Sequence, residues 1–411
     1  MSSEIAEKTG AEKASADRPG RGKPKRTERI LVVDDIEDNR QLLVRRLERE
    51  GFQGIALAGD GEEALALIAA QPFDLVLLDV MMPRCDGYQV LERLKGLGRL
   101  HELPVIVISA LNEIDSVVRC IELGAVDYLP KPFNPILLRA RVGASLDQKR
   151  LRDQVRNHLA QLETELNAAR SLQMSMVPSS FPPPTSDRPV EIFAAMEAAR
   201  EVGGDLYDFF WTADGRLAFL IGDVSGKGVP AAMFMARTKN LLRVVSDFML
   251  RDGTSGPAEI LTRVNRELCD GNAQMMFVTL YLGLLDPKTG ALQFCNAGHD
   301  PPYVLGGAEL RETAGAHGMA LGIEADWKYE TSALTVSPGE TLFLYTDGIS
   351  EADGPDGRQF TKRGIEAVLR QAAAKAAAPD ALIGAMTSVV KEFAGTIPQS
   401  DDITALALRR V

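Results

Sequence analysis

The stretch Gly222-Asp-Val-Ser-Gly-Lys-Gly228 joins a short apolar run, residues 217–221, to a long helical pattern that begins at Val229. An apolar run that ends at glycines predicts a buried strand followed by a tight turn, and this turn carries Asp223. A buried carboxylate is costly unless it is paired or binds a cation. The turn offers only Lys227 as a local cation. The stretch therefore predicts an ion pair or a metal ligand at Asp223.

Acids at the ends of other predicted strands repeat this arrangement. Asp205 follows two glycines and opens an aromatic run, and Asp347 ends an apolar run. The pair Asp401 and Asp402 opens the last apolar run of the chain. An isolated Asp-Gly pair is usually a surface turn, but four such positions in order favour a common site whose carboxylate oxygens suit Mg²⁺ or Mn²⁺. Two such cations about 4 Å apart activate water for hydrolysis of phosphate esters.

Six motifs in this half of the chain occur in one consistent order between about residues 165 and 411. They are Gly203-Gly-Asp-Leu-Tyr-Asp208, the 222–228 stretch, Met276-Phe-Val-Thr279, Asn296-Ala-Gly-His-Asp-Pro-Pro302, Tyr345-Thr-Asp-Gly348 and Asp401-Asp-Ile-Thr404. Together they resemble the metal-dependent serine/threonine phosphatases of the PPM (type 2C) family, most closely its bacterial sporulation and stress-response branch. The resemblance implies an αββα sandwich, two Mn²⁺ or Mg²⁺ ions and a protein-serine/threonine phosphatase activity.

The pattern of predicted elements agrees with that fold class. Strands occur in blocks with helices between them rather than in strict alternation, which favours antiparallel sheets flanked by helices, an α+β arrangement. The sequence Asp286-Pro-Lys-Thr-Gly290 separates two apolar runs and predicts a hairpin. A domain of this kind is expected over residues 179–411.

The resemblance also implies roles for individual residues. Asp223 would bridge both metals, and the carbonyl of Val224 would bind one of them. Asp347 and Asp401 would complete the coordination of the second ion. Asp402 is the alternative to Asp401, because one sequence does not decide which of two adjacent acids turns inward.

Other positions are matched less directly. Asp205 would bind a metal or orient its water. The arginine and the histidine acid found near the metals of eukaryotic type 2C enzymes have no clear counterpart, as is usual in this branch. Arg200 and Lys227 are therefore the candidates for a phosphate contact. His299 is expected to stabilise a loop or, alternatively, to lie near the site.

Length and composition extend the prediction to the whole chain. Its 411 residues, 45% hydrophobic and 25% charged, predict two or three domains of ordinary composition. The net charge of −11 argues against nucleic acid as the main partner. Four cysteines without a Cys-x-x-Cys pair favour a reducing compartment and no zinc site. Without an apolar stretch of about 18 residues or a secretory leader, we expect a cytoplasmic protein without membrane insertion.

From Ile30 onward, short apolar runs alternate with helical stretches. The runs are residues 30–33, 54–57, 75–78, 105–108 and 126–129. This alternation predicts an α/β domain, a flavodoxin-like, doubly wound five-stranded parallel sheet with helices on both faces, over residues 29–146. Ligands bind at the carboxyl edge of such a sheet, so residues that follow the strands converge there.

Polar side chains follow four of these runs. Asp34 and Asp35 come after the first run and Asp79 after the third. Ser109 comes after the fourth run and Lys131 just after the fifth. Clustered carboxylates repel one another unless a divalent cation lies among them. With Mg²⁺ held by Asp35 and Asp79, Asp79 could act as a nucleophile toward a phosphoryl group whose oxygens Lys131 and Ser109 would bind.

These positions carry a second resemblance. The motifs are Val32-Val-Asp-Asp35, Leu78-Asp-Val-Met-Met-Pro83, Ser109-Ala110 and Tyr128-Leu-Pro-Lys-Pro-Phe133. They resemble the receiver domain of response regulators. The resemblance implies that Asp79 accepts a phosphoryl group from a sensor histidine kinase. It also places Tyr128 at the aromatic switch position, although a packed aromatic at a strand end is the other interpretation.

A helical stretch connects the two predicted domains. Residues 134–176 contain no glycine after Gly143 and are rich in Leu, Ala, Gln, Glu and Arg. Apolar residues at coiled-coil spacing are Val155, Leu159, Leu162, Leu166 and Ala169. Such a stripe predicts a homodimer through a linker at residues 147–178, with a helix folded back onto its own chain as the alternative. Its last part, including Gln173, is similar to the helix that precedes the catalytic core in the phosphatase branch, and Pro178 ends it.

The remaining residues, 1–28, have the composition of a disordered tail. The whole chain is thus expected to be a two-component response regulator whose aspartyl phosphorylation controls a metal-dependent phosphatase. The resemblance implies a phosphoserine substrate, commonly a phosphorylated anti-sigma-factor antagonist in a partner-switching pathway. Two alternatives are a non-enzymatic adaptor that only binds such a partner and a diguanylate cyclase. The Gly-Gly-Asp motif of the cyclases is followed here by Leu-Tyr instead of Glu-Phe.

Overall fold

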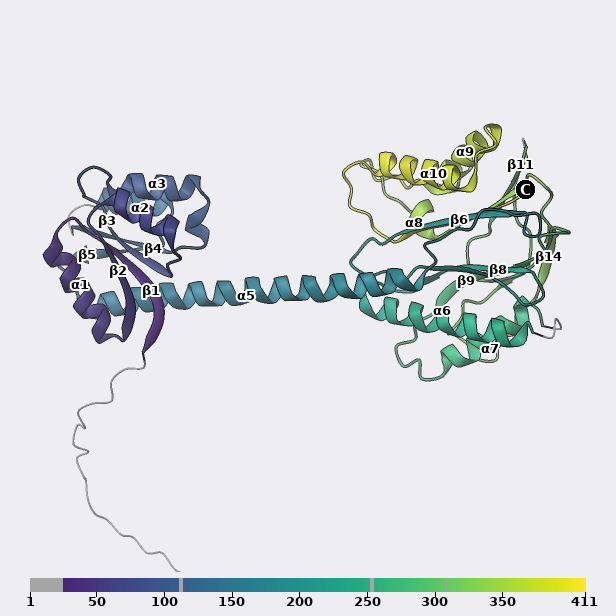
Figure 1. Ribbon diagram of the computed structural model, residues 1–411, viewed down its shortest axis with the longest axis horizontal. Coiled ribbons are helices and arrows are strands. Elements are labelled where there is room, and N and C mark those ends of the chain that lie inside the picture. Colours follow the sequence, from purple (N-terminus) through teal and green to yellow (C-terminus); the bar gives the residue numbers. More distant parts are fainter. Residues whose placement is uncertain (1–24, 111–113, 252–254, 308) are drawn as a thin grey trace, which may run out of the picture. The chain divides into compact units, whose positions relative to one another are not determined.

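The structure is a computed structural model that describes residues 25–110, 114–251, 255–307 and 309–411 (Figure 1). The chain divides into two compact units, Met1–Gln161 and Leu162–Val411, and the boundary falls within the long helix α5 (Pro135–Met176). Residues 1–24 of the predicted tail lie outside the described residues. The first strand begins at Arg26, within the last residues assigned to that tail.

The first unit is built on a five-stranded sheet in which every neighbouring pair is parallel. Its spatial order is β2-β1-β3-β4-β5. The strands are β1 (Arg26–Val33), β2 (Phe52–Ala58), β3 (Leu75–Asp79), β4 (Val105–Ala110) and β5 (Asp127–Lys131). Each contains one of the five predicted apolar runs or most of it, because strands covered on both faces need near-continuous apolar sequence.

Helices cover both faces of this sheet. They are α1 (Glu37–Arg49), α2 (Gly61–Ala70), α3 (Gly87–Gly96), α4 (Ile114–Leu123) and the first part of α5, with a 3₁₀ turn at Arg99–His101. Successive residues of β1 point to opposite faces. Leu31 and Val33 pack in a core with α2, α3 and α4, whereas Ile30 and Val32 pack in a second core with α1 and α5. The doubly wound, flavodoxin-like α/β fold predicted from the sequence is confirmed.

The second unit contains two sheets that are mostly antiparallel. One has the order β13-β10-β9-β8-β7 with β14 on β10, and the other β12-β11-β15-β16-β6. Their strands are β6 (Val190–Glu197), β7 (Leu206–Trp211), β8 (Leu217–Val224), β9 (Val278–Leu285), β10 (Ala291–Ala297), β11 (Tyr303–Gly306), β12 (Glu309–Glu312), β13 (His317–Gly318), β14 (Ser332–Thr335), β15 (Thr341–Tyr345) and β16 (Ile403–Arg410). The predicted hairpin joins β9 to β10, and Gly290 adopts a positive φ of 78° in its turn.

Helices flank the two sheets on their outer faces (Figure 1). They are α6 (Val229–Met249) and α7 (Pro257–Cys269) on one side, and α8 (Asp347–Ser350), α9 (Thr361–Ala374) and α10 (Pro379–Ala394) on the other. A separate core between the sheets contains Phe219, Tyr281 and Leu344. The layers therefore follow one another as helix, sheet, sheet, helix, which is the αββα sandwich that the resemblance implied.

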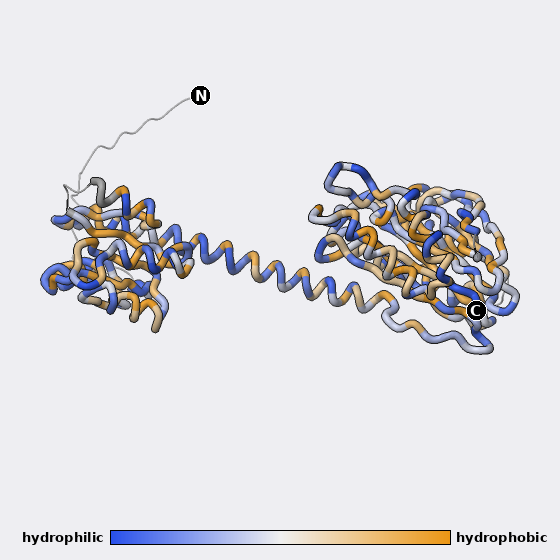
Figure 2. The backbone as a smooth tube through the Cα atoms, turned by 90° about the horizontal axis from the view of Figure 1, so that it is seen from above, coloured by the Kyte–Doolittle hydropathy of each residue, from blue (hydrophilic) through white to orange (hydrophobic). Residues whose placement is uncertain are grey.

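Helix α5 is continuous from Pro135 to Met176, so the predicted linker is helical almost to Pro178. Figure 2 shows apolar positions recurring along an otherwise hydrophilic helix. The side chains of Val155, Leu159 and Leu162 are 59%, 56% and 48% exposed. Although α5 has 42 residues, neither it nor any other described helix is apolar enough over a sufficient length to cross a membrane.

Candidate functional site

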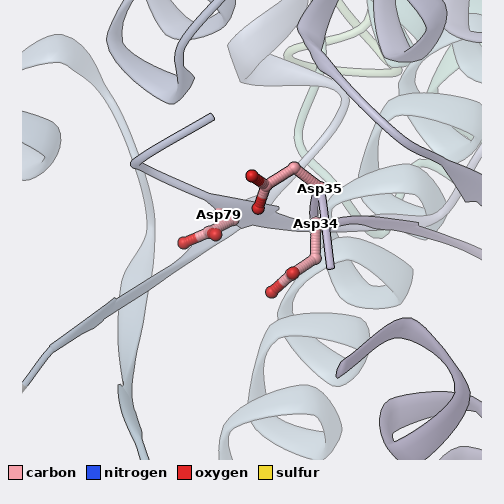
Figure 3. Close-up of side chains that lie close together, drawn as sticks. All are labelled: Asp34, Asp35 and Asp79. Carbon is pink, nitrogen blue, oxygen red and sulfur yellow. The ribbon is translucent and has the colours of Figure 1, made fainter. Parts of the chain in front are cut away.

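Three acids gather at the carboxyl edge of the parallel sheet (Figure 3). Asp34 and Asp35 follow β1, and Asp79 ends the adjacent strand β3. One ligand atom of each lies within 4.8 Å of the others. Across the described residues, no other group of three or more His, Cys, Asp or Glu side chains comes this close. Asp34 and Asp79 are buried and Asp35 is exposed, so the group is open to solvent on one side and suits a hard cation.

Lys131 supplies the positive charge of this group. Its Nζ lies 3.0 Å from Asp34 Oδ2 and 2.8 Å from Asp79 Oδ2. Burial acts to lower the pKa of Lys131, but the hydrogen bonds to Asp79 and Asp34 outweigh it and the pKa is raised. Burial raises the pKa of Asp79 despite the lysine. Lys131 therefore stays protonated beside a carboxylate that is short of solvation, the setting expected of a group that accepts a phosphoryl unit and one that binds its oxygens.

Asp34 is also held by the chain around it. The backbone N–H of Ile36 donates to Asp34 Oδ1 at 2.9 Å, and the side-chain amide of Asn39 donates to both oxygens. With Lys131 added, Asp34 has several partners, whereas Asp35 is exposed to solvent. We infer that Asp35 and Asp79 are the acids better placed to bind a cation.

The two predicted switch residues lie on the neighbouring strands. Ser109 is buried near the end of β4, where it is paired in register with Pro130 of β5, the residue before Lys131. Tyr128 on β5 is 38% exposed, and the guanidinium of Arg141 lies 5.6 Å from its ring centroid. The ring is thus outward and is covered by an arginine rather than packed in the core.

In the second unit, the predicted acids surround the end of β8. Asp223 lies opposite Thr279 of β9. Burial, followed by repulsion from Asp347 and Asp401, raises the pKa of Asp223 to about 7. Burial, followed by repulsion from Asp401, raises the pKa of Asp347 to about 6. Residues that are far apart in sequence are therefore close enough to disfavour one another's charge.

Asp205 belongs to the same group. It is buried, and its pKa is raised by that burial and by repulsion from Asp223 and Asp402. The hydroxyl of Thr346 donates to Asp205 Oδ2 at 2.8 Å. Buried carboxylates at this density need positive charge, and an oxygen-only donor set fits Mg²⁺ or Mn²⁺. The donor chemistry therefore fits the two cations that the resemblance implies, although among the described residues no three of these acids come as close together as the receiver acids do.

The adjacent acids Asp401 and Asp402 have different surroundings. Asp402 is buried, and its two oxygens accept from the backbone N–H groups of Ala199 at 2.8 Å, Gly204 at 2.7 Å and Asp205 at 3.4 Å. Asp401 remains 34% exposed and pairs with Lys227 at 2.8 Å. Asp402 thus holds the loop that carries Asp205, and we infer that Asp401 is the acid available to a cation.

This difference predicts unequal effects on stability. Asp402→Asn places an amide donor where a carboxylate oxygen accepts backbone N–H groups, so we expect the free energy of unfolding to fall by about 1–3 kcal/mol. The thermal midpoint should drop by roughly 2–12 °C. Asp401→Asn should change it little, since that side chain is partly exposed. Thermal melts of both variants in EDTA test this, and equal midpoints would contradict the assignment.

The two candidate phosphate contacts are placed differently. Lys227 donates to the carbonyl of Ser400 at 2.5 Å and pairs with Asp401, so it lies at the edge of the acid group. Arg200 is exposed in the loop before Gly203 and forms no ion pair with any described residue. The structure thus brings Lys227, but not Arg200, into contact with the acids.

His299 is buried, and burial lowers its pKa to about 4. Its Nδ1 lies 3.0 Å from the hydroxyl of Thr279. The side chain of Asn296 bonds both the backbone N–H and the carbonyl of His299, each at 2.8 Å. The bonds to Asn296 hold the loop that carries this neutral imidazole, and its contact with Thr279, the residue opposite Asp223, also places it close to the acid group.

Two residues of this region were not singled out for these contacts. Thr346, beside Asp347, donates to Asp205 and accepts from the N–H of Thr404. Gln173 of α5 is buried, and its amide donates to the carbonyl of Gly203 at 2.6 Å and accepts from the N–H of Gly203 at 3.2 Å. In the sequence, Thr346 is only a hydroxyl residue at the end of a predicted strand, and Gln173 is only a glutamine in a leucine-rich helix. Neither feature shows which residue it bonds.

Comparison with known proteins adds to this geometry. The family described as response regulator receiver domain matches residues 30–143, and the family described as Stage II sporulation protein E (SpoIIE) matches residues 213–411. Among solved structures, the SiaA-PP2C domain of Pseudomonas aeruginosa aligns with a TM-score of 0.53 and 25% identity, over 61% of this chain and 98% of that one.

The relatives with similar sequences match only part of this chain, and only part of each relative is matched. Protein IcfG of Synechocystis is 32% identical over 269 residues, which is 60% of this chain and 41% of that protein. Response regulator MprA of Mycobacterium tuberculosis is 44% identical over 125 residues, 30% of this chain and 53% of that protein. The chain thus spans about half the length of these relatives. With the fold and the family matches, the chain joins an N-terminal receiver domain of the response regulators to a C-terminal PP2C-type phosphatase domain of the SpoIIE family.

Proposed function

We propose that this protein is a two-component response regulator in which phosphorylation of Asp79 controls a metal-dependent protein serine/threonine phosphatase. The observation that carries the proposal is the group of buried and half-buried acids around Asp223 in a PP2C-type domain, and the raised pKa values of Asp223 and Asp347 support a bound cation there. The receiver domain implies a phosphodonor such as a sensor histidine kinase, and the phosphatase domain implies a phosphoprotein substrate.

In the receiver, a carboxylate oxygen of Asp79 would attack the phosphorus of the phosphodonor, and the bond from phosphorus to the donor would break so that the dephosphorylated donor leaves. Lys131, which now contacts Asp79 at 2.8 Å, would bind an oxygen of the new acyl phosphate, and Ser109 at the same sheet edge would bind another. Mg²⁺ held by Asp35 and Asp79 would offset the charge that accumulates there. These residues would act together because they all lie at the carboxyl edge of the parallel sheet.

In the phosphatase domain, Asp223, the carbonyl of Val224, Asp347 and Asp401 would hold two Mn²⁺ or Mg²⁺ ions. The ions would activate water and stabilise the charge that develops on the phosphoryl group. Asp205 would orient that water or bind a metal, and the 2.8 Å bond from Thr346 supports a fixed carboxylate at this point. Lys227, which pairs with Asp401 at the edge of the acid group, would contact the phosphate of the substrate.

The proposed substrate is a protein that bears phosphoserine or phosphothreonine. Its finer identity, a phosphorylated anti-sigma-factor antagonist in a partner-switching pathway, rests on the resemblance to the stress-response branch. The full chain should release phosphate from phosphoserine peptides with Mn²⁺ and not with EDTA, as measured with malachite green. Binding of such peptides without release would instead favour the non-enzymatic adaptor.

A homodimer through α5 is the proposed route between the two activities. The exposed apolar stripe at Val155, Leu159 and Leu162 supports pairing with a second copy. Farther along the same helix, Gln173 bonds the backbone of Gly203, two residues before Asp205. A change in the register of paired helices could thus reach an acid of the phosphatase group without a direct contact between the domains.

Breaking α5 should uncouple the two activities. Leu162→Pro removes a helical hydrogen bond and costs about 3 kcal/mol or more locally, so we expect basal phosphatase turnover to remain while its response to phosphorylation is lost. Leu162→Ala keeps the helix and serves as the matched control for backbone disruption. Turnover is measured with and without a small phosphodonor. An unchanged response in Leu162→Pro would mean that the signal travels by another route.

A further inference from the structure

A cavity of about 270 Å³ lies beside the phosphatase acids, between α8, the end of α10 and the segment that leads to β16. Its apolar lining consists of Ala352, Val390, Ala394, Ile397, Pro398 and Ile403. We call it the α10 pocket. Its volume is below the roughly 300–1,000 Å³ of sites for drug-sized ligands. It is therefore suited to a single bulky side chain.

The α10 pocket is lined in part by direct sequence neighbours of two proposed catalytic acids. Gly348, which follows Asp347, and Ser400, which precedes Asp401, both line it. The side chain of Gln399 in its wall donates to the carbonyl of Asp401 at 2.7 Å and to that of Glu197 at 2.9 Å. A group bound in the pocket would thus lie next to two of the acids that would act on a phosphoryl group.

The charges at the rim select against a charged occupant. Lys391 lines the pocket, but both oxygens of Glu197 hold its ammonium, at 2.8 and 2.7 Å. Asp353 on the other wall would repel a second acid. With a largely apolar lining and its lysine paired with Glu197, the pocket favours an uncharged aliphatic or aromatic side chain.

We propose that the α10 pocket is a specificity site that receives one large apolar side chain of the phosphoprotein substrate, a few residues from its phosphoserine. This inference rests on the proposed phosphatase function and adds to it a substrate class: a segment with an apolar anchor close to the phosphorylated residue. Removal of a leucine side chain from water on binding should raise kcat/KM by about ten- to a hundredfold over alanine at that position.

The test uses the full chain with Mn²⁺ and a set of phosphoserine peptides in which a single leucine is moved through each flanking position of an alanine-rich background. One position should give the expected gain in kcat/KM. Ala394→Trp, which fills the pocket, should abolish that gain while p-nitrophenyl phosphate turnover stays unchanged. Ala385→Trp, at an exposed position of the same helix outside the pocket, is the matched control.

A second variant keeps the proposal testable if Ala394→Trp does not fold. Ile397→Glu changes a side chain that is 39% exposed, so folding should survive, and the new charge should reduce the leucine gain at the same peptide position. A flat leucine scan, or a gain that persists in Ala394→Trp, would overturn the pocket assignment and leave the phosphatase function intact. If the variant alters only the response to receiver phosphorylation, the pocket holds a segment of this chain and the substrate proposal is wrong. No turnover of any peptide would overturn the phosphatase function itself.

Discussion

Asp223→Asn is expected to reduce phosphatase turnover by about a hundred- to a thousandfold, the scale of losing a group that stabilises transition-state charge. Asp223 has the central position among the acids, since Asp347, Asp401, Asp205 and Asp402 all act on its pKa. An asparagine keeps the shape of the side chain but cannot bridge two cations with two anionic oxygens. The loss should therefore fall on catalysis and on metal binding together.

The thermal stability of Asp223→Asn distinguishes a role of Asp223 in catalysis and metal binding from a structural role. Burial and repulsion disfavour the ionised form of Asp223, whose pKa is about 7 in the folded protein and about 3.9 in an unfolded chain. The folded, metal-free protein then binds more protons than the unfolded chain between these values, so the wild type loses stability as pH rises through them. Asp223→Asn should therefore melt at the same or a higher temperature than wild type at pH 8 in EDTA.

The measurement is release of phosphate from a phosphoserine peptide with Mn²⁺, beside a thermal melt in EDTA. Asp214→Asn is the control, because Asp214 is an exposed acid in the turn between β7 and β8, where it pairs with Arg216. Substantial turnover by Asp223→Asn, or full wild-type turnover in EDTA, would refute the metal-dependent mechanism. A large drop in the melting temperature would indicate a structural role for the carboxylate instead.

The second large effect concerns the receiver. Asp79→Asn should abolish phosphorylation by a small phosphodonor such as acetyl phosphate, because the amide lacks the nucleophilic oxygen that forms the acyl phosphate. The variant should fold, since burial already disfavours the charge of Asp79. Its basal phosphatase turnover should stay at the wild-type level, while any change of turnover on adding phosphodonor should disappear.

Phosphate-affinity gels with Mg²⁺ measure the labelling, and Asp147→Asn, at an exposed position on α5, is the control. Lys131→Ala is a second variant that keeps the acceptor Asp79 but removes the 2.8 Å contact to it, and the gels compare its labelling with that of the wild type. If Asp79→Asn is labelled as well as wild type, another residue accepts the phosphoryl group. If labelling is lost but the phosphatase response persists, the response does not depend on Asp79.

The local pattern of apolar and polar residues was enough to predict much of the architecture. Residues 75–78 form a run of apolar side chains bounded by polar residues, and β3 extends from Leu75 to Asp79. The same reasoning identified the β9–β10 hairpin from Asp286 to Gly290. It did not identify the short elements β13 and α8, because segments of two and four residues carry no periodicity. The position of Asp347 as the first residue of α8 came only from the structure.

The sequence by itself determined that acids stand at strand ends, because strand ends are marked by local changes in hydrophobicity. Only the tertiary structure decided which of Asp401 and Asp402 faces the backbone of Gly204. Side chains of adjacent residues in an extended chain point in opposite directions, so the sequence shows that only one of the two faces inward. Which one does so depends on the packing of β6 and of the loop before Asp205. The tertiary structure also decided that Gln173 bonds Gly203 and that Gly348 and Ser400 share one pocket. Such contacts join residues distant in sequence, and the packing of whole layers, not the local pattern, brings them together.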